Sequence, residues 1–178
     1  DQTEKYLPPA KGQKHVLRIL REILFHQNTS KGTDLNAALR FINHVLRRRA
    51  VVFFLSDFII PKSKDAQESQ EDLFFKEISS TRKKHDLVCA QISDPCEQNI
   101  PECGLTFLQD LESEEAVLID CSKKTFREKY AQLTLEFQKR FNQRMRRRGI
   151  DTFSFSTNSD YVKSLKEFFR MRENRRNR

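Results

Sequence analysis

Apolar residues near the start of the chain recur every three or four positions, which is the spacing of an amphipathic helix. This pattern predicts a helix over residues 13–26. A second helix is expected soon afterwards, with Thr33 or Asp34 as the residue that caps its first turn. We therefore expect the chain to open with two helices that each bury one face.

Two stretches of mostly apolar residues follow these helices. Residues 50–55 are six apolar residues in succession, and residues 86–92 form the second stretch. Such stretches are typical of strands that are covered on both faces, as in a parallel sheet flanked by helices. Between them, residues 61–71 are polar and predict a loop, which leads into a helix that ends near Lys84.

A hairpin and a long helix are expected next. Residues 104–109 and 115–120 predict two short strands, with the turn between them at residues 112–114. An apolar stripe that starts at Phe126 then predicts a long helix ending near Arg148.

The chain closes with one more strand and one more helix. Phe153 and Phe155 alternate with polar residues, as in a strand. Thr157 and Asp160 have the spacing of a capping box ahead of a final helix. The complete order of elements predicts an α/β fold, with a doubly wound, mostly parallel sheet and helices on both faces.

The length of 178 residues suits one domain over residues 1–178, with enough chain to bury a core, and 37% of the residues are hydrophobic. The net charge of +8 is unevenly distributed. Residues 61–120 hold 6 Lys and Arg against 14 Asp and Glu, whereas residues 121–178 hold 17 against 6 and end in a basic tail at 171–178. Such asymmetry allows a surface for an acidic partner or a nucleic acid.

The sequence offers no feature of a secreted or membrane-spanning protein. Its longest apolar run has six residues, whereas a bilayer-spanning helix needs about 20. No signal peptide opens the chain, and the four Cys form no CxxC pair. We therefore expect a cytoplasmic protein with reduced thiols and no membrane span.

Candidate chemistry gathers at the expected carboxyl ends of the strands, where ligands of open α/β sheets bind. Asp57 follows the first strand and Asp94 the second, and Thr33 lies in the turn that opens the preceding helix. Hydroxyl and carboxylate oxygens are the donors that Mg²⁺ prefers. The spacing alone equally allows Thr33 to be a helix cap and Asp57 to be a turn residue.

Sequence motifs for catalysis are missing. The chain contains no G-x-S-x-G elbow, no phosphate-binding Walker loop and no HExxH, so we expect no enzymatic activity. His85, at the entrance of the second strand, is interpreted as a structural hydrogen-bonding residue. The cluster Arg146, Arg147 and Arg148 could neutralise phosphates, or could be a solvated helix end.

A set of six motifs occurs in order along nearly the whole chain, from about Tyr6 to Phe169. They are KGTDLNAAL (31–39), RRRAVVFFLSDF (47–58), KHDLV (84–88), DPCE (94–97), PECGL (101–105) and TNSDY (157–161). As a set, they resemble the von Willebrand factor A-like domain of a bacterial family, domain-of-unknown-function family fifty-eight. The resemblance implies a Rossmann-like sheet that carries a metal-ion-dependent adhesion site.

That adhesion site joins three elements: a DxSxS motif, a Thr in a helix-opening turn, and an Asp after a later strand. Thr33 and Asp57 match the second and third elements, and Asp34 and Asp94 are the neighbouring candidates for contact with a partner. No DxSxS occurs in this sequence. The resemblance therefore implies Mg²⁺ in a full-length protein, no bound metal in this chain, and a match to the C-terminal part of the family's domain with its first strands missing.

The missing strands and the family together suggest partners. A strand at residues 51–55 without its neighbour would leave an apolar edge, which predicts self-association or pairing with another fragment. The resemblance implies a non-enzymatic protein-interaction domain, an adaptor or co-chaperone to a MoxR-type AAA+ ATPase, with no small-molecule substrate. The alternative is a basic nucleic-acid-binding module that uses residues 146–148.

Overall fold

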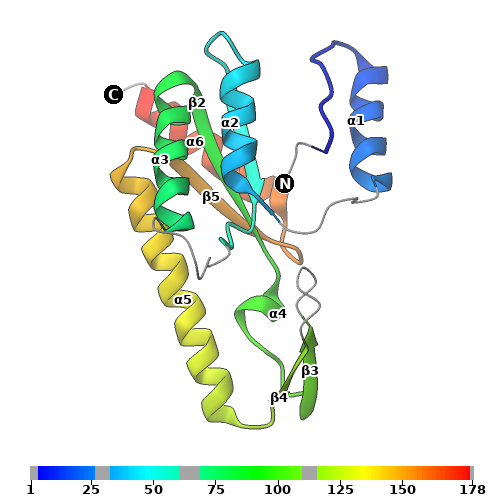
Figure 1. Cartoon of the computed structure of the whole chain (residues 1–178), viewed down its shortest axis with the longest axis vertical. Coiled ribbons are helices and arrows are strands. Elements are labelled where there is room, and N and C mark those ends of the chain that lie inside the picture. The colour runs from blue at the N-terminus through cyan, green and yellow to red at the C-terminus, as the bar shows by residue number, and fades with distance from the viewer. Residues whose placement is uncertain (1–3, 27–32, 61–68, 110–115, 177–178) are drawn as a thin grey trace.

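The computed structural model describes residues 4–26, 33–60, 69–109 and 116–176 (Figure 1). Helices and strands alternate over most of this range. In chain order they are α1 (Gln13–Phe25), α2 (Leu35–Val45), β1 (Val51–Ser56), α3 (Gln70–Lys84), β2 (Asp86–Ser93), α4 (Pro95–Gln98), β3 (Leu105–Gln109), β4 (Ala116–Asp120), α5 (Lys124–Arg147), β5 (Asp151–Ser156) and α6 (Tyr161–Arg176).

The central sheet has three parallel strands in the order β1-β2-β5. In its register Val52 lies opposite Leu87, and Ala90 lies opposite Phe153. The strands β3 and β4 form a separate antiparallel hairpin. These pairings confirm the α/β fold with a mostly parallel sheet that the sequence predicts.

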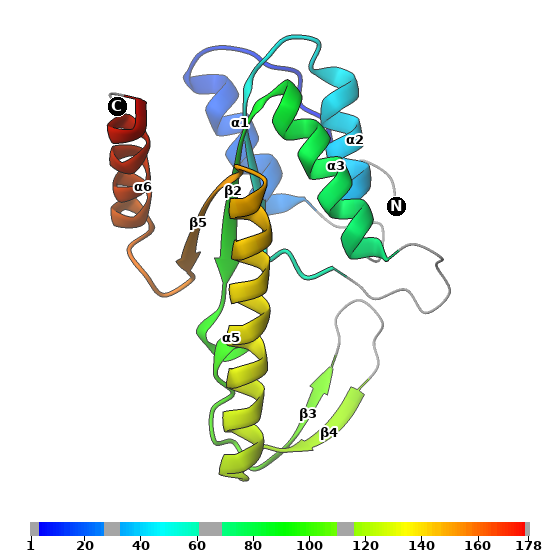
Figure 2. The same cartoon turned by 90° about the vertical axis from the view of Figure 1, so that its left-hand side faces the viewer.

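Helices cover both faces of the sheet, as Figure 2 shows with α6 on one side and α2, α3 and α5 on the other. Residues in strands alternate between the two faces. Leu87 and Cys89 of β2 therefore join the core on the three-helix side. The aromatic ring of Phe153 in β5 instead packs on Phe168 of α6, with 4.7 Å between the ring centroids.

Aromatic side chains fill the core on the three-helix side. The ring of Phe58, which is fully buried, contacts the rings of Phe74 and Phe141 at centroid distances of 6.1 and 5.0 Å. Around them, the buried residues are Leu35, Leu39, Val52, Phe75, Ile78, Leu87, Cys89, Met145 and Ile150. The burial of this apolar surface holds α2, α3 and α5 to the sheet.

The first half of α5 and the hairpin extend beyond the sheet (Figure 2). Phe141 and Met145 are the residues of α5 that are buried, whereas Leu133 in its first half is exposed. The apolar stripe expected from Phe126 onward is therefore fully buried only where the helix reaches the core, and Phe126, Tyr130 and Phe137 are half-buried. Apolar side chains of the hairpin, such as Phe107, are exposed as well.

The side of the molecule at α1 and β1 is also poorly covered. The apolar stripe of α1, including Leu20 and Ile23, is exposed, and no residue of this helix is buried. In β1, Phe53 and Leu55 are exposed by 42% and 56% of their surface. Among the described residues, β1 pairs with β2 alone, so its other edge is open.

The structure confirms most of the expected elements and corrects two details. Asp160, rather than Thr157, caps α6, because its carboxylate accepts hydrogen bonds from the backbone N–H groups of Val162 and Lys163. The short helix α4 was not expected. The predicted turn at residues 112–114 and residues 61–68 of the predicted loop lie outside the described residues, and α3 begins at Gln70, before the end of that loop at residue 71.

Asp34, one of the two cap candidates for α2, is the residue that caps it. In the part of the chain that the structure describes, no helix combines the length and the apolar character needed to cross a bilayer.

Candidate functional site

The carboxyl ends of the three parallel strands lie at one edge of the sheet, and α2 begins at that same edge. A helix that leads into a parallel strand runs antiparallel to it, so its first turn lies beside the end of the strand. Asp34 and Thr33 therefore share this edge with Asp57, which follows β1, and Asp94, which follows β2. The structure thus places the four predicted site residues at one edge.

Asp57 is exposed and is held in a fixed turn. The hydroxyl of Ser56 accepts a hydrogen bond from the backbone N–H of Phe58 at 2.9 Å and donates one to Asp57 Oδ1 at 3.2 Å. The backbone N–H of Ile59 also donates to Oδ1, at 3.1 Å. In addition, Gln91 Nε2 donates to the Asp57 carbonyl at 3.4 Å.

Phe58 explains why the turn at Asp57 is rigid. Its φ of 59° lies in the left-handed region, where a bulky residue is strained. The conformation persists because the ring is fully buried in the aromatic core. The buried ring therefore fixes the backbone that presents the Asp57 carboxylate to solvent.

Asp34 serves α2 as its N-cap. Its Oδ1 accepts hydrogen bonds from the backbone N–H groups of Asn36 at 2.8 Å and Ala37 at 2.9 Å. Its Oδ2 lies 3.7 Å from a guanidinium nitrogen of Arg40. Thr33, directly before it, is exposed.

Asp94 is engaged through both of its carboxylate oxygens. Oδ1 accepts from the backbone N–H of Cys96 at 2.8 Å, and Glu97 completes a capping box for α4. Oδ2 accepts from the hydroxyl of Thr157, at 2.7 Å, which connects the ends of β2 and β5. These hydrogen bonds lower the pKa of the Asp94 carboxyl, and the one from Thr157 has the largest effect.

These residues do not fit a complete magnesium site. Mg²⁺ takes six oxygen ligands in octahedral geometry. Thr33 and Asp57 carry oxygens of the right kind, but Asp34 uses one oxygen as a cap and faces Arg40 with the other, and both oxygens of Asp94 accept hydrogen bonds. Among the described residues, no group of three or more His, Cys, Asp or Glu side chains is placed to hold a metal ion.

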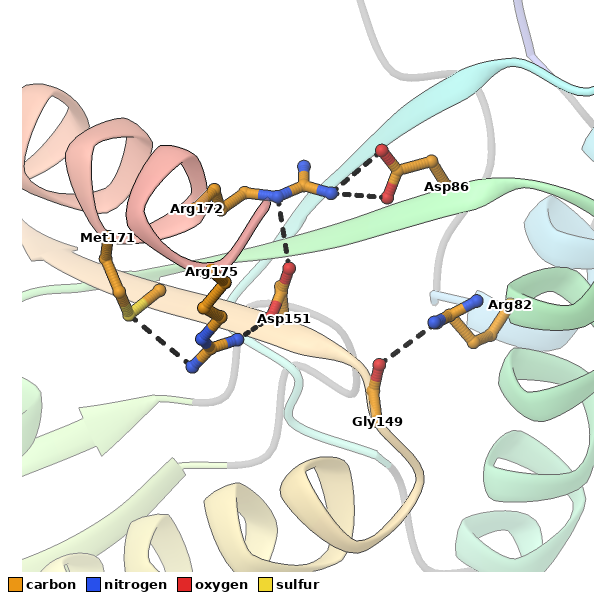
Figure 3. Close-up of polar contacts among 7 residues, drawn as sticks. All are labelled: Arg82, Asp86, Gly149, Asp151, Met171, Arg172 and Arg175. Carbon is orange, nitrogen blue, oxygen red and sulfur yellow. Dashed lines mark hydrogen bonds and ion pairs between the residues drawn. The ribbon is translucent and has the colours of Figure 1, made fainter. Parts of the chain in front are cut away.

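The opposite, amino edge of the sheet carries an ion-pair cluster that sequence reasoning missed (Figure 3). Arg172 Nη2 donates to both carboxylate oxygens of Asp86 at 2.6 and 2.8 Å, and its Nε lies 3.1 Å from Asp151 Oδ2. Arg175 Nη1 donates to Asp151 Oδ1 at 2.7 Å. The sequence shows Asp86 and Asp151 as the first residues of their strands, but not which arginines they meet.

The same cluster connects elements far apart in the chain. It joins α6 to the first residues of β2 and β5, and Arg82 of α3 donates to the Gly149 carbonyl at 3.0 Å just beside it (Figure 3). The guanidinium groups of Arg172 and Arg175, which belong to the basic segment 171–178, are thus neutralised by carboxylates rather than free for an anion.

Arg146, Arg147 and Arg148, the candidate phosphate-binding residues, differ in their surroundings. The Arg148 guanidinium lies 4.6 Å from the Phe75 ring centroid and donates to the Arg144 carbonyl at 3.0 Å. Arg146 and Arg147 are exposed on α5. The three residues therefore do not form one cluster of equivalent anion-binding groups.

His85 and the cysteines remain to be placed. The His85 ring is buried, and neither of its nitrogens has a hydrogen-bond partner among the described residues, so the expected structural hydrogen bond is not found. Cys89 is buried in β2, and desolvation raises the pKa of its thiol to about 12. Cys96 and Cys103 are exposed, and all four cysteines are free thiols.

Comparisons with known proteins agree with the motif set. The family model described as "Protein of unknown function DUF58" matches residues 1–140, which is most of the chain. No curated protein and no solved structure matches the chain significantly. The chain belongs to the DUF58 family.

Proposed function

We propose that this DUF58 chain is a non-catalytic protein-interaction module that recognises its partner at the carboxyl edge of the sheet. The presentation of Asp57 carries the proposal. Its carboxylate is exposed and its backbone is fixed by the buried ring of Phe58. A rigid, solvent-facing carboxylate loses little conformational entropy when it binds a cationic group.

The neighbours of Asp57 support recognition rather than proton transfer. Asp34 and Asp94 lie at the same edge, and their oxygens are engaged in helix caps, by Arg40 and by Thr157. They add negative charge to the edge, and their fixed positions favour a partner that offers a positive group. Thr33 adds a hydroxyl beside them.

The resemblance to the von Willebrand factor A-like domains suggests a more specific version. The edge would be the remnant of a metal-ion-dependent adhesion site in which Thr33 and Asp57 persist, and its partner would be a MoxR-type AAA+ ATPase. Magnesium would bind there only with oxygen donors beyond those of the described residues. We therefore expect millimolar MgCl₂ to leave the melting temperature of this chain unchanged.

Binding to a purified MoxR-type AAA+ ATPase from the same genome tests the proposal. Asp57→Asn removes the charge but keeps the Oδ1 acceptor for Ile59, and should weaken binding at least tenfold. Glu173→Gln is the matched control, because it removes one exposed negative charge near the amino edge and should bind like the wild type. Equal affinity of all three proteins would refute recognition at Asp57.

The open edge of β1 is the proposed site of self-association. Val51, Phe53 and Leu55 expose apolar surface beside backbone groups that lack a strand partner among the described residues. Exposed apolar edges pair readily with another chain. Size-exclusion chromatography with light scattering at micromolar concentration should show a species larger than the 21.1 kDa monomer; a purely monomeric profile would contradict this.

A further inference from the structure

The side of β5 that faces away from β2 lines a groove between α5 and α6. This groove is separate from the carboxyl edge, since it contains none of the residues described there. The groove has a volume of about 550 Å³, and residues 149–154 line its floor at the edge of β5. α5 forms one wall and α6 the other. The wall residues are Lys139, Asn142, Gln143 and Arg146 from α5, with Met171 and Arg175 from α6.

The backbone on the floor of this groove is available for pairing. Among the described residues, β5 pairs with β2 alone, so alternate N–H and C=O groups of β5 face the groove. Within the same described ranges, no hydrogen bond outside the β2–β5 pairing reaches the backbone of residues 151–155. β5 thus offers an open strand edge.

The α5 wall is positively charged. Lys139, Asn142, Gln143 and Arg146 follow one another at helical spacing, which places them on one face of α5. Lys139 and Arg146 are exposed and form no ion pair with any described residue. The carboxylate in the groove, Asp151, is already neutralised by Arg172 and Arg175.

We infer that this groove binds an acidic segment of a protein partner in extended conformation, which adds to the sheet as a strand beside β5. Main-chain hydrogen bonds to β5 would provide affinity, as in other cases of strand addition. Acidic side chains on one face of the segment would meet Lys139 and Arg146. Apolar side chains on the other face would meet Met171.

The dimensions suit a short peptide. The strand β5 has six residues and so spans about 20 Å, and its residues 151–154 line the groove. A nucleic acid fits less well, because it would meet the cations but leave the strand edge unpaired. The aromatic ring nearest the groove, Phe153, packs on Phe168 and is not free to stack on bases.

Fluorescence anisotropy with a labelled six-residue peptide that alternates Glu and Val tests this inference independently of Asp57. Lys139→Glu/Arg146→Glu should weaken binding at least tenfold. Arg140→Glu/Arg147→Glu is the matched control, since these exposed arginines of the same helix lie outside the groove and the charge change is identical. This control should bind within about threefold of the wild type, and circular dichroism should show both double variants folded.

Two further probes separate strand addition from attraction of charge alone. The same peptide with alternate backbone nitrogens methylated cannot pair with β5 and should lose binding, and a six-nucleotide oligothymidylate should bind more weakly than the peptide. Equal loss in the two double variants, undiminished binding of the methylated peptide, or tighter binding of the oligonucleotide would each overturn the inference.

Discussion

At the amino edge of the sheet, the carboxylates that begin β2 and β5 are saturated by the guanidinium groups of Arg172 and Arg175. At the carboxyl edge, Asp57 uses one oxygen for its own turn and exposes the rest of its carboxylate to solvent. Both edges present acidic side chains at strand ends. The difference indicates that the amino edge fastens α6 to the sheet, while the carboxyl edge keeps a charged group exposed to solvent.

The two edges are also stabilised by different forces. Ion pairs between α6 and the sheet hold the amino edge, and these are partly exposed. At the carboxyl edge, the ring of Phe58 is buried in the core and fixes the backbone of the turn that carries Asp57. Removing the buried ring should therefore lower the free energy of unfolding more than removing an arginine of the ion pairs.

The largest effect is expected for Phe58→Ala. Removing a fully buried aromatic ring from a packed core typically costs 3–5 kcal/mol, about 4 kcal/mol here, in the free energy of unfolding. Urea denaturation measures this loss, with Phe107→Ala in the exposed hairpin as a control that should stay within about 0.5 kcal/mol of wild type. A loss for Phe58→Ala below about 1.5 kcal/mol would mean that the carboxyl edge is not anchored in the core.

A smaller loss is expected for Arg172→Met. The change removes the ion pairs to Asp86 and Asp151, but these side chains are partly exposed, so we expect about 1–2 kcal/mol. Arg170→Met on the same helix is exposed and should cost less than about 0.5 kcal/mol. If the two variants unfolded at the same urea concentration, the amino edge would not fasten α6.

The smallest effect concerns the pKa of Asp94. Because the hydroxyl of Thr157 donates to its carboxylate, Thr157→Val should raise this lowered pKa toward its ordinary value near 3.8. A lowered folded pKa stabilises the protein above the ordinary value and loses that contribution as the pH falls through the folded pKa. The stability deficit of Thr157→Val should therefore shrink in acid.

NMR titration of the Asp94 carboxyl measures this change in pKa directly. Thr152→Val, in β5 and outside the hydrogen bond to Asp94, is the control and should leave the titration unchanged. An unshifted Asp94 in Thr157→Val would show that another group sets its pKa.

The sequence predicted the parallel sheet because strands with continuous apolar runs and helices with periodic ones leave distinct patterns. It placed Thr33, Asp34, Asp57 and Asp94 at one edge because the ends of parallel strands coincide. Their positions at strand ends and in the helix-opening turn selected Asp57, Asp94 and Thr33, and the family motifs then favoured a metal role for Thr33 and Asp57.

Features that depend on long-range contacts could not be predicted in this way. The pairing of Arg172 with Asp86 joins residues 86 positions apart, and no local pattern encodes it. The strained backbone of Phe58 follows from the tertiary packing of its ring. The first half of α5, where Leu133 is exposed, has the same apolar periodicity as the second half, where Phe141 and Met145 are buried. Periodicity alone therefore did not show where the core ends.

The free energy of unfolding of Asp57→Asn tests the central contrast most directly. If Asp57 is presented for recognition, urea denaturation at neutral pH should give a value within about 0.5 kcal/mol of wild type, well above that of Arg172→Met. A loss as large as that of Arg172→Met would contradict the account, because Asp57 would then hold the fold together as the amino-edge carboxylates do.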